Sequence, residues 1–245
     1  QQGKKVLLID ADAQANLTMA LGYNRPDDIP ITLSTVMQNI IDDKTLDVSQ
    51  GIIHHSEGVD LLPSNIEMSG FEVRLINAMS RERVLKTYVN EVKKNYDYVL
   101  IDCMPSLGMI TINALAAADS VIIPTQPHYL SAKGLELLLR SVSMVKRQIN
   151  PKLRIDGILM TMVMPRTNIS KEITATVKSA YGKKIKVFDT EIPHSIRAVE
   201  ATAEGKSIFA YDKSGKVAAA YEQLGKEVAE IGEKQRNQNR ADRIR

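Results

Sequence analysis

Two apolar segments of the chain each end in aspartate, and this pattern predicts magnesium and phosphate chemistry. VLLIDADAQAN places Asp10 and Asp12 behind its apolar run, and YDYVLIDCMPSLG places Asp102 behind a second run. A short β-branched run that stops at Asp is typical of a buried parallel strand, which carries the carboxylate to the carboxyl edge of a sheet. Nucleotides and their metal ions bind at that edge in open α/β sheets. Asp10, Asp12 and Asp102 are therefore candidate site residues.

The first aspartate motif also has a purely structural interpretation. A carboxylate beside an apolar sheet is costly unless a cation meets it, and a magnesium-bound nucleotide would supply that cation. Alternatively, Asp12 or Asn16 only caps the helix that follows. The unit D-A-D-A-Q-A-N, taken as a whole, favours the first interpretation.

The second motif has the arrangement of a Walker B segment. Asp102 ends the apolar run, and Pro105, Ser106 and Gly108 form a turn into the next helix. In this arrangement the aspartate holds the hydration shell of Mg²⁺, and the loop behind it can sense the γ-phosphate. The signal is weak for one motif alone, but a third strand-like run, SVIIPTQP, follows it. The two aspartate motifs together predict a site for a nucleotide and Mg²⁺.

The chain resembles the ParA/Soj family of DNA-partitioning ATPases, members of the deviant-Walker class of P-loop proteins that also includes MinD. The resemblance covers almost the whole chain. It is carried, in chain order, by VLLIDADAQANLTMALG, YDYVLIDCMPSLG, VIIPTQPHYLSAKGL, MPRTNIS, EIPHSIRAVEATAEGKSIFAYD and AAAYEQLGKEV.

The resemblance implies roles for individual residues. Asp12 matches the acidic residue that positions or activates the attacking water, and Asp10 matches the one that supports the metal site. Asp102 matches the residue that binds Mg²⁺ through water. Gln14 and Pro193 match positions at the ATP nucleotide, and the loop with Pro105, Ser106 and Gly108 matches the switch loop.

The most diagnostic part of such a family has no counterpart in these 245 residues. No G-x-x-x-x-G-K-[S/T] sequence occurs, and the family's phosphate loop precedes the segment that matches QQGKKVLLID. We expect that the natural start has been cut away and that the first strand, the P-loop and the first helix are lacking. This chain should then bind ATP poorly and hydrolyse it at no useful rate, because positioning and charge neutralisation supply nearly all catalysis of phosphoryl transfer. Ala13 and Met104 replace prolines common in the family, which predicts looser loops without a lost chemical group.

Basic residues in the second half of the chain are candidate DNA contacts. Arg197 matches the position of a DNA-contacting arginine, and Lys183, Lys184 and Arg166 are further candidates. Alternatively, all four are ordinary solvated side chains. Contacts of this kind would be independent of DNA sequence and sensitive to salt. The net charge of +3 does not decide between these two interpretations. Residues 234–245 hold five basic residues and one acid, Asp242, so the net charge of residues 1–233 is −1.

Composition excludes several classes of protein. With 4% aromatic residues and no Trp, a stacking platform for single-stranded nucleic acid is not expected. The single cysteine, Cys103, excludes an internal disulfide framework and suits a reducing compartment. No apolar run approaches the 18 or so residues of a membrane span. We expect a cytoplasmic protein, associated with the nucleoid by its family resemblance, and no membrane partner.

The order of elements predicts an α/β fold, with a mostly parallel central sheet and helices on both faces. We expect a ParA-like nucleotide-binding domain over residues 1–233, and a basic tail over 234–245 that is a fraying helix end or disordered. Strands are expected at 5–9, 59–62, 98–101, 120–123, 155–163 and 185–188. Helices are expected at 32–41, 82–95, 109–117, 132–149 (capped by Ser131), 170–180 and 215–233.

The leading functional hypothesis is a nucleotide-switched partition ATPase. ATP would close a homodimer that binds nonspecific double-stranded DNA, and a ParB-type centromere-binding partner would stimulate hydrolysis. A MinD-like positioning ATPase is one alternative, but the amphipathic membrane helix of that branch needs bulky apolar residues, and the tail offers only Ile244. An ATPase-dead adaptor or a bacterial tyrosine-kinase relative is another. The tyrosine cluster of the latter is absent, and the retained aspartates argue against the adaptor.

Overall fold

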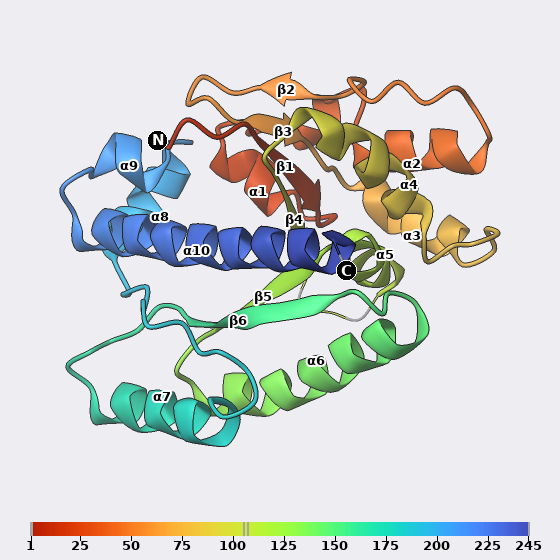
Figure 1. The fold of residues 1–245 in the computed structure, drawn as a ribbon. Coiled ribbons are helices and arrows are strands. Elements are labelled where there is room, and N and C mark those ends of the chain that lie inside the picture. The colour runs from red at the N-terminus through yellow and green to blue at the C-terminus, as the bar shows by residue number, and fades with distance from the viewer. Residues whose placement is uncertain (1, 105, 107, 245) are drawn as a thin grey trace. The chain divides into compact units, whose positions relative to one another are not determined.

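The computed structural model describes residues 2–104, 106 and 108–244, and these form two compact units (Figure 1). Unit 1 comprises Gln1–Asp119, Arg140–Leu153 and Thr202–Ser207, and unit 2 comprises Ser120–Leu139, Arg154–Ala201 and Ile208–Arg245. Each unit is an α/β structure with parallel strands and flanking helices, in agreement with the predicted fold class.

The sheet of unit 1 has four strands in the order β2-β3-β1-β4. Its central strand is β1 (Val6–Ala11), which pairs in parallel with β3 (Asp60–Leu62) on one side and β4 (Tyr98–Cys103) on the other. The short β2 (Ile53–His54) pairs antiparallel with β3 at one edge, and no predicted strand corresponded to it. Both aspartate strands run one residue beyond their Asp, so each motif ends slightly later than its pattern indicated.

One face of this sheet forms the core of unit 1. Alternate residues of a strand point to opposite faces, and Leu7, Ile9 and Ala11 of β1 are buried in one cluster with Phe71 and Tyr88. The helices that supply the cluster are α2 (Leu33–Ile41), α3 (Glu67–Leu75), α4 (Val84–Val92) and α5 (Met109–Ala117). Unit 1 also contains three short helices, namely α1 (Asn16–Ala20), η1 (Pro26–Asp28) and η2 (Lys93–Asn95).

The far edge of β4 is less well covered. Among the residues that the structure describes, β4 pairs only with β1, so its other edge has no strand partner. Leu100, which is in register with Leu8 of β1, is 53% exposed in the middle of the strand. Parallel strands with apolar residues on both faces are normally buried on both faces, so β4 is an unusually open strand.

Unit 2 is built on two parallel strands, β5 (Ser120–Thr125) and β6 (Arg154–Met160). One apolar cluster joins Ile123 and Ile158 of these strands to the helices α6 (Tyr129–Gln148) and α7 (Asn168–Tyr181), of which only the first part of α6 belongs to this unit. A second cluster joins Leu159 to the helices α8 (Ile196–Ala203), α9 (Ile208–Tyr211) and α10 (Lys216–Ile244).

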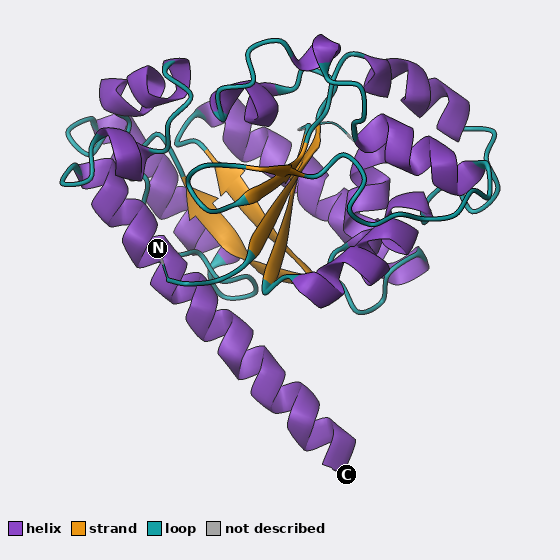
Figure 2. Ribbon diagram, turned by 90° about the horizontal axis from the view of Figure 1, so that it is seen from above, coloured by secondary structure: helices purple, strands orange, loops and turns teal. Residues whose placement is uncertain are grey.

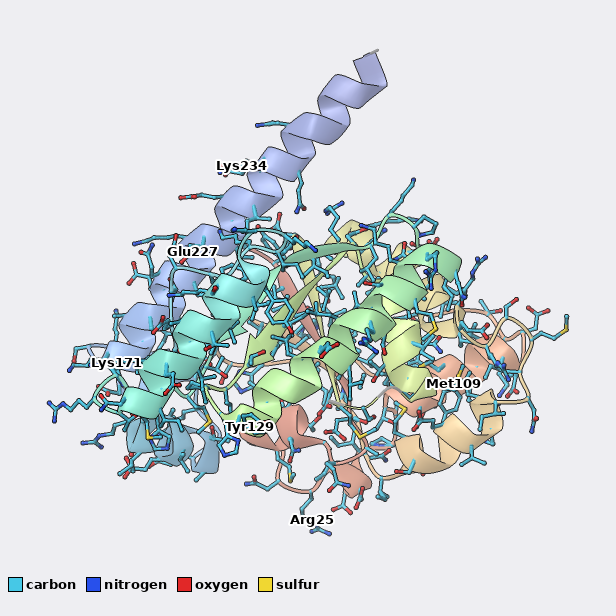
Figure 3. The ribbon with its side chains drawn as sticks, turned by 90° about the horizontal axis from the view of Figure 1, so that it is seen from below. Arg25, Met109, Tyr129, Lys171, Glu227 and Lys234 are labelled. Atoms are coloured by element: carbon cyan, nitrogen blue, oxygen red, sulfur yellow. The ribbon has the colours of Figure 1, made fainter. Side chains whose placement is uncertain are left out.

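Glu227 of α10 holds the segment that follows Phe188 in place through hydrogen bonds. Its carboxylate accepts hydrogen bonds from the backbone N–H groups of Asp189 (3.3 Å) and Thr190 (2.9 Å) and from the Thr190 hydroxyl. Lys186 lies 3.5 Å from the same carboxylate and 5.0 Å from the centre of the Phe188 ring. Burial disfavours the charged carboxylate, but these hydrogen bonds outweigh it and lower the pKa of Glu227. Figure 3 shows Glu227 on the helix that also carries Lys234.

Several predicted elements differ from those observed. Helix α6 begins at Tyr129, so Ser131 is its third residue and not its N-cap. Residues 185–188 form no named strand and contribute only a bridge between Ile158 and Val187. Helix α10 runs to Ile244, beyond the predicted end of this helix at residue 233, because Gln, Lys, Arg and Ala continue a helix readily; Figure 2 shows it as one continuous helix. The helices α1, α3, α8 and α9 were not predicted.

Candidate functional site

Asp10 and Asp102 lie directly opposite each other near the carboxyl ends of β1 and β4. In a parallel pair, register partners project from the same face of the sheet. The structure therefore brings together the two aspartates that the sequence places 92 residues apart, and Asp12 follows in the loop after β1. This agrees with the predicted grouping of the three carboxylates at one sheet edge.

Asp10 is fully buried and held by three hydrogen bonds. Its Oδ2 accepts bonds from the backbone N–H (2.9 Å) and the hydroxyl (2.7 Å) of Thr18, and its Oδ1 accepts one from the Asp12 N–H (3.1 Å). Burial raises the pKa of Asp10, although the hydrogen bonds oppose that shift. Because its acceptors are used within the protein, Asp10 is suited to fix the loop that carries Asp12.

The Thr18 hydroxyl extends this arrangement to the end of β3. It accepts a hydrogen bond from the Ser64 backbone N–H (3.2 Å) while it donates to Asp10. Thr18 and Ser64 are both fully buried, and the Ser64 hydroxyl itself has no partner among the described residues. The role of Thr18 and Ser64 at this site was not predicted from the sequence. The one sequence feature that pointed to it is a threonine eight residues after Asp10.

Asp12 is half-buried at the start of a tight loop. Its Oδ1 accepts a hydrogen bond from the Gln14 N–H (2.9 Å), and its carbonyl accepts one from Ala15 N–H (3.0 Å). Ala15 is the N-cap of α1, adopts a left-handed backbone with φ of +52°, and offers no side-chain cap. Neither Asp12 nor Asn16 caps α1 through its side chain, so the alternative interpretation as a simple helix cap is wrong. The Gln14 side chain is exposed.

The negative charges of neighbouring carboxylates disfavour the ionised forms of Asp10 and Asp102. Desolvation is the largest cause of the raised pKa of Asp102, and the negative charges of Asp10 and Asp12 add to it. The neighbouring Cys103 packs against the core of unit 1, where burial, followed by the same aspartates, raises the pKa of its thiol to about 12. A cation at this edge would relieve the repulsion between the carboxylates.

The donor set at this edge suits a hydrated divalent cation. Among the described residues, no group of three His, Cys, Asp or Glu side chains is placed to hold a metal ion by itself. Mg²⁺ commonly keeps several waters and is held by one or two carboxylates together with phosphates. Asp102 is exposed near the end of β4, so its carboxylate is open to such a cation, and Asp12 follows the neighbouring strand β1.

The loop after β4 leads into α5, whose N-cap is Gly108. Glu72 of α3 reaches this helix end, since its Oε1 accepts a hydrogen bond from the Ile110 N–H (3.3 Å). A Cβ on Gly108 would lie 2.2 Å from the same oxygen, so glycine leaves room for the carboxylate. Ser106 is exposed, whereas Pro105 of the predicted switch loop lies outside the described residues. Glu72 was not recognised in the sequence.

Pro193, the predicted nucleotide contact, lies in unit 2 in a strand-like segment beside the end of β6. Val163 N–H donates to Ile192 O (3.0 Å), and His194 N–H donates to Val163 O (3.0 Å). Pro193 is half-buried and pairs with Val163 in an isolated parallel bridge. Met162 of this segment adopts a left-handed backbone with φ of +53°, a conformation that often marks functional loops.

The predicted DNA contacts are exposed residues of unit 2. Arg197 lies on α8, is exposed, and has its Nη1 3.4 Å from Glu200 Oε2. Arg166 lies in the turn before α7, and Lys183 and Lys184 follow the end of that helix. Since α7 has 14 residues and an α-helix rises about 1.5 Å per residue, roughly 20 Å separates Arg166 from the lysines. These residues therefore do not share one small patch.

Comparison with known proteins agrees with this architecture. The family model described as AAA domain matches residues 1–155. The sporulation initiation inhibitor protein Soj of Bacillus subtilis is 41% identical over 231 residues, which cover 94% of this chain and 88% of that protein. The chromosome partitioning protein ParA of Myxococcus xanthus is 36% identical over 227 residues, which cover 92% and 77%.

A solved structure adds a nucleotide-bound relative of similar fold. The cobyrinic acid a,c-diamide synthase of Mycobacterium smegmatis, solved with an ATP analogue and magnesium, is 33% identical to this chain. The alignment covers 91% of this chain and 80% of that one, with a TM-score of 0.78. The helices of the described residues include none long and apolar enough to cross a membrane.

Proposed function

Because the chain belongs to the ParA/Soj family of partitioning ATPases, we propose that it serves in the ATP-dependent segregation of plasmid or chromosomal DNA. The observation that carries the proposal is the register of Asp10 with Asp102, with Asp12 in the adjoining loop. The family's ATPase names, and the relative solved with an ATP analogue and magnesium, support ATP and Mg²⁺ as ligands.

We assign three roles to the three aspartates. Asp12 positions or activates the attacking water, and Asp102 binds Mg²⁺ through its hydration shell. Asp10 supports the site by holding the loop that carries Asp12, as its three internal hydrogen bonds favour. Gln14 and Pro193 line the nucleotide, and the loop with Pro105, Ser106 and Gly108 responds to the γ-phosphate. Bound Mg²⁺ would neutralise charge that develops on the phosphates.

We further propose that ATP closes a homodimer which binds double-stranded DNA without sequence preference. Arg197, Lys183, Lys184 and Arg166 would contact phosphates, and a ParB-type centromere-binding partner would stimulate hydrolysis. The protein would then act in the cytoplasm on the nucleoid. With no phosphate-loop sequence in these 245 residues, this chain alone should not hydrolyse ATP at a useful rate.

The catalytic role of Asp12 is tested in a chimera in which a phosphate-loop segment of the ParA/Soj family precedes this chain. Asp12→Ala should lower the rate of ATP hydrolysis at least about 100-fold, because a positioned base typically contributes that much, and should preserve the ATP-bound dimer. The control is Asp119→Ala, an exposed aspartate before β5. Hydrolysis at the parental rate in the Asp12 variant would show that another group acts on the water.

The DNA surface is tested in the same chimera by gel-shift titration with ATP. Arg197→Ala should weaken DNA binding and reduce the slope of log K against log salt by about one, because one phosphate contact is lost. The matched control is Arg25→Ala, since Arg25 (labelled in Figure 3) is also exposed and is paired with an acid three residues later, Asp28. Equal binding by the two variants would remove Arg197 from the interface. Tight ATP-dependent binding to lipid vesicles instead of DNA would favour the MinD-like alternative.

A further inference from the structure

Two adjoining hollows open at the amino ends of the strands of unit 1. The larger has a volume of about 440 Å³ and the smaller of about 100 Å³, and they share His54, Asn95 and Tyr96 as walls. Lys5, which lines the larger one, precedes β1 and lies five residues before Asp10. At about 3.3 Å per residue, roughly 16 Å of strand separates this region from the aspartate site. The hollows are therefore a second place, away from the proposed catalytic edge.

A hydrogen-bonded chain runs through the shared wall. Tyr96 donates its hydroxyl to Asp60 Oδ2 (2.6 Å), and His54 Nδ1 lies 2.6 Å from Asp60 Oδ1. A carboxylate only accepts, so the proton of this bond is on Nδ1. Both oxygens of Asp60 thereby accept a hydrogen bond, and Asp60 is the only acid among the described residues that line the hollows. The carboxylate orients His54, whose side chain is 84% exposed. With one proton on Nδ1, the Nε2 atom donates a hydrogen bond only when the ring is the doubly protonated imidazolium, the form that a neighbouring carboxylate favours.

The neighbouring histidine is engaged differently. His55 Nε2 lies 3.1 Å from the Leu21 carbonyl, and its Nδ1 accepts a hydrogen bond from the Glu57 N–H (3.2 Å). Both of its ring nitrogens are therefore used within unit 1. Lys5 has its backbone N–H held by Asp97 (2.9 Å), but its ammonium group makes no ion pair within the described part of the chain. Lys5 and, in its imidazolium form, His54 are thus the two cationic groups of the larger hollow that can meet an anion.

We propose that the two hollows together bind a small organic anion, with its carboxylate or phosphate at Lys5 Nζ and at the Nε2 N–H of the His54 imidazolium, and its apolar part in the smaller recess. The recess is walled on one side by Val48 and Ile52 and can take a ring or a short aliphatic group. The two volumes together fall within the range of small-molecule sites, which combine apolar walls with a few oriented polar groups. Asn95 lies at the junction and can donate its amide to the anion.

This site is separate from the proposed partition chemistry, so its test uses the chain as it is. The four histidines are labelled with ¹³C at Cε1 and followed by NMR during titration with phenyl phosphate or inorganic phosphate at constant ionic strength. The His54 signal, assigned with His54→Gln, should shift and saturate with a Kd of about 1 mM, which is reasonable for a ligand of this size. Inorganic phosphate should bind about 10-fold more weakly, because it leaves the apolar recess empty.

Lys5→Gln should weaken phenyl phosphate binding about 10-fold. The matched control is Lys4→Gln, which removes the same charge from an adjacent exposed residue that does not line the hollows and should leave binding unchanged. Equal weakening by both variants, uniform shifts of all four histidines, or no saturation by about 20 mM would overturn the site. Equal affinity for the two phosphates would overturn the assignment of an organic anion.

Discussion

At the scale of single residues, three aspartates of one type are given different roles by their surroundings. Asp10 is fully buried with three donors around it, Asp12 is half-buried in a loop, and Asp102 is exposed at a strand end. A buried carboxylate that accepts several hydrogen bonds from the protein serves structure, whereas an exposed carboxylate can serve a ligand. Thr18 supplies two of the three hydrogen-bond donors that contact Asp10. These bonds give Asp10 its structural role.

Thr18→Val should destabilise the protein by about 2–4 kcal/mol, since Asp10 loses a charge-assisted hydrogen bond and the Ser64 N–H loses its acceptor. Urea unfolding followed by circular dichroism measures the change, and Thr18→Ser should restore most of it. The matched control is Thr174→Val, because the Thr174 hydroxyl is buried without a partner among the described residues; its stability should change by less than about 1 kcal/mol. An equal loss of unfolding free energy in both valine variants would show that the hydrogen bonds of the Thr18 hydroxyl do not stabilise the protein.

At the scale of elements, a short segment far along the chain completes unit 1. Residues 202–207 cluster with residues 1–119, and the Ser207 N–H donates to Glu57 Oε1 (2.9 Å). Gly205 and Gly22 approach so closely that a Cβ on Gly205 would lie 2.4 Å from the Gly22 Cα. Both glycines have positive φ. This contact needs glycine for space as well as for backbone conformation.

Gly205→Ala should therefore destabilise unit 1 by more than the cost of a left-handed backbone alone. The matched control is Gly58→Ala, where φ is also positive, +81° against +64°, but a Cβ would meet nothing within 4 Å. The control should cost about 1–2 kcal/mol, and Gly205→Ala about 1–3 kcal/mol beyond that, because the backbones must separate. Thermal unfolding of the two variants gives the comparison. If the two variants differ in stability by less than about 0.5 kcal/mol, the close approach of Gly205 to Gly22 does not contribute to stability.

At the scale of the whole molecule, the chain carries an open apolar strand. The edge of β4 away from β1 has no strand partner among the described residues, and Leu100 is 53% exposed there. Unpaired edges with exposed apolar side chains are templates for pairing with other chains. We expect the isolated chain to self-associate at high protein concentration through this edge.

Leu100→Lys should reduce that self-association several-fold, because a charge on an edge strand opposes pairing. Light scattering across a protein concentration series measures it. Val73→Lys adds the same charge at an apolar residue of α3 that is 67% exposed and not on a strand, so it should leave association nearly unchanged. An equal effect of the two lysines would indicate that net charge, and not the β4 edge, governs association.

Much of this architecture could be predicted from residue patterns, and the failures have identifiable causes. The helix at 109–117 has the predicted bounds, and β1 and β4 lie where their β-branched runs indicated. Helix α3 was missed because Ser69 and Gly70 lower its helical propensity, which packing of Met68, Phe71 and Leu75 overrides. The strand expected at 185–188 is only a bridge, since its apolar pattern fits a bridge and a strand equally well.

The sequence by itself determined the family, the α/β class and the three aspartates, because local spacing sets where a strand ends and which side chain its end carries. Only the tertiary structure decided that Asp10 faces Asp102, that Thr18 and Ser64 hold Asp10, and that Glu72 meets the start of α5. It likewise decided that Lys5 and His54 line one hollow. These contacts join residues far apart in the chain, and their pairing depends on register and packing, which no local pattern encodes.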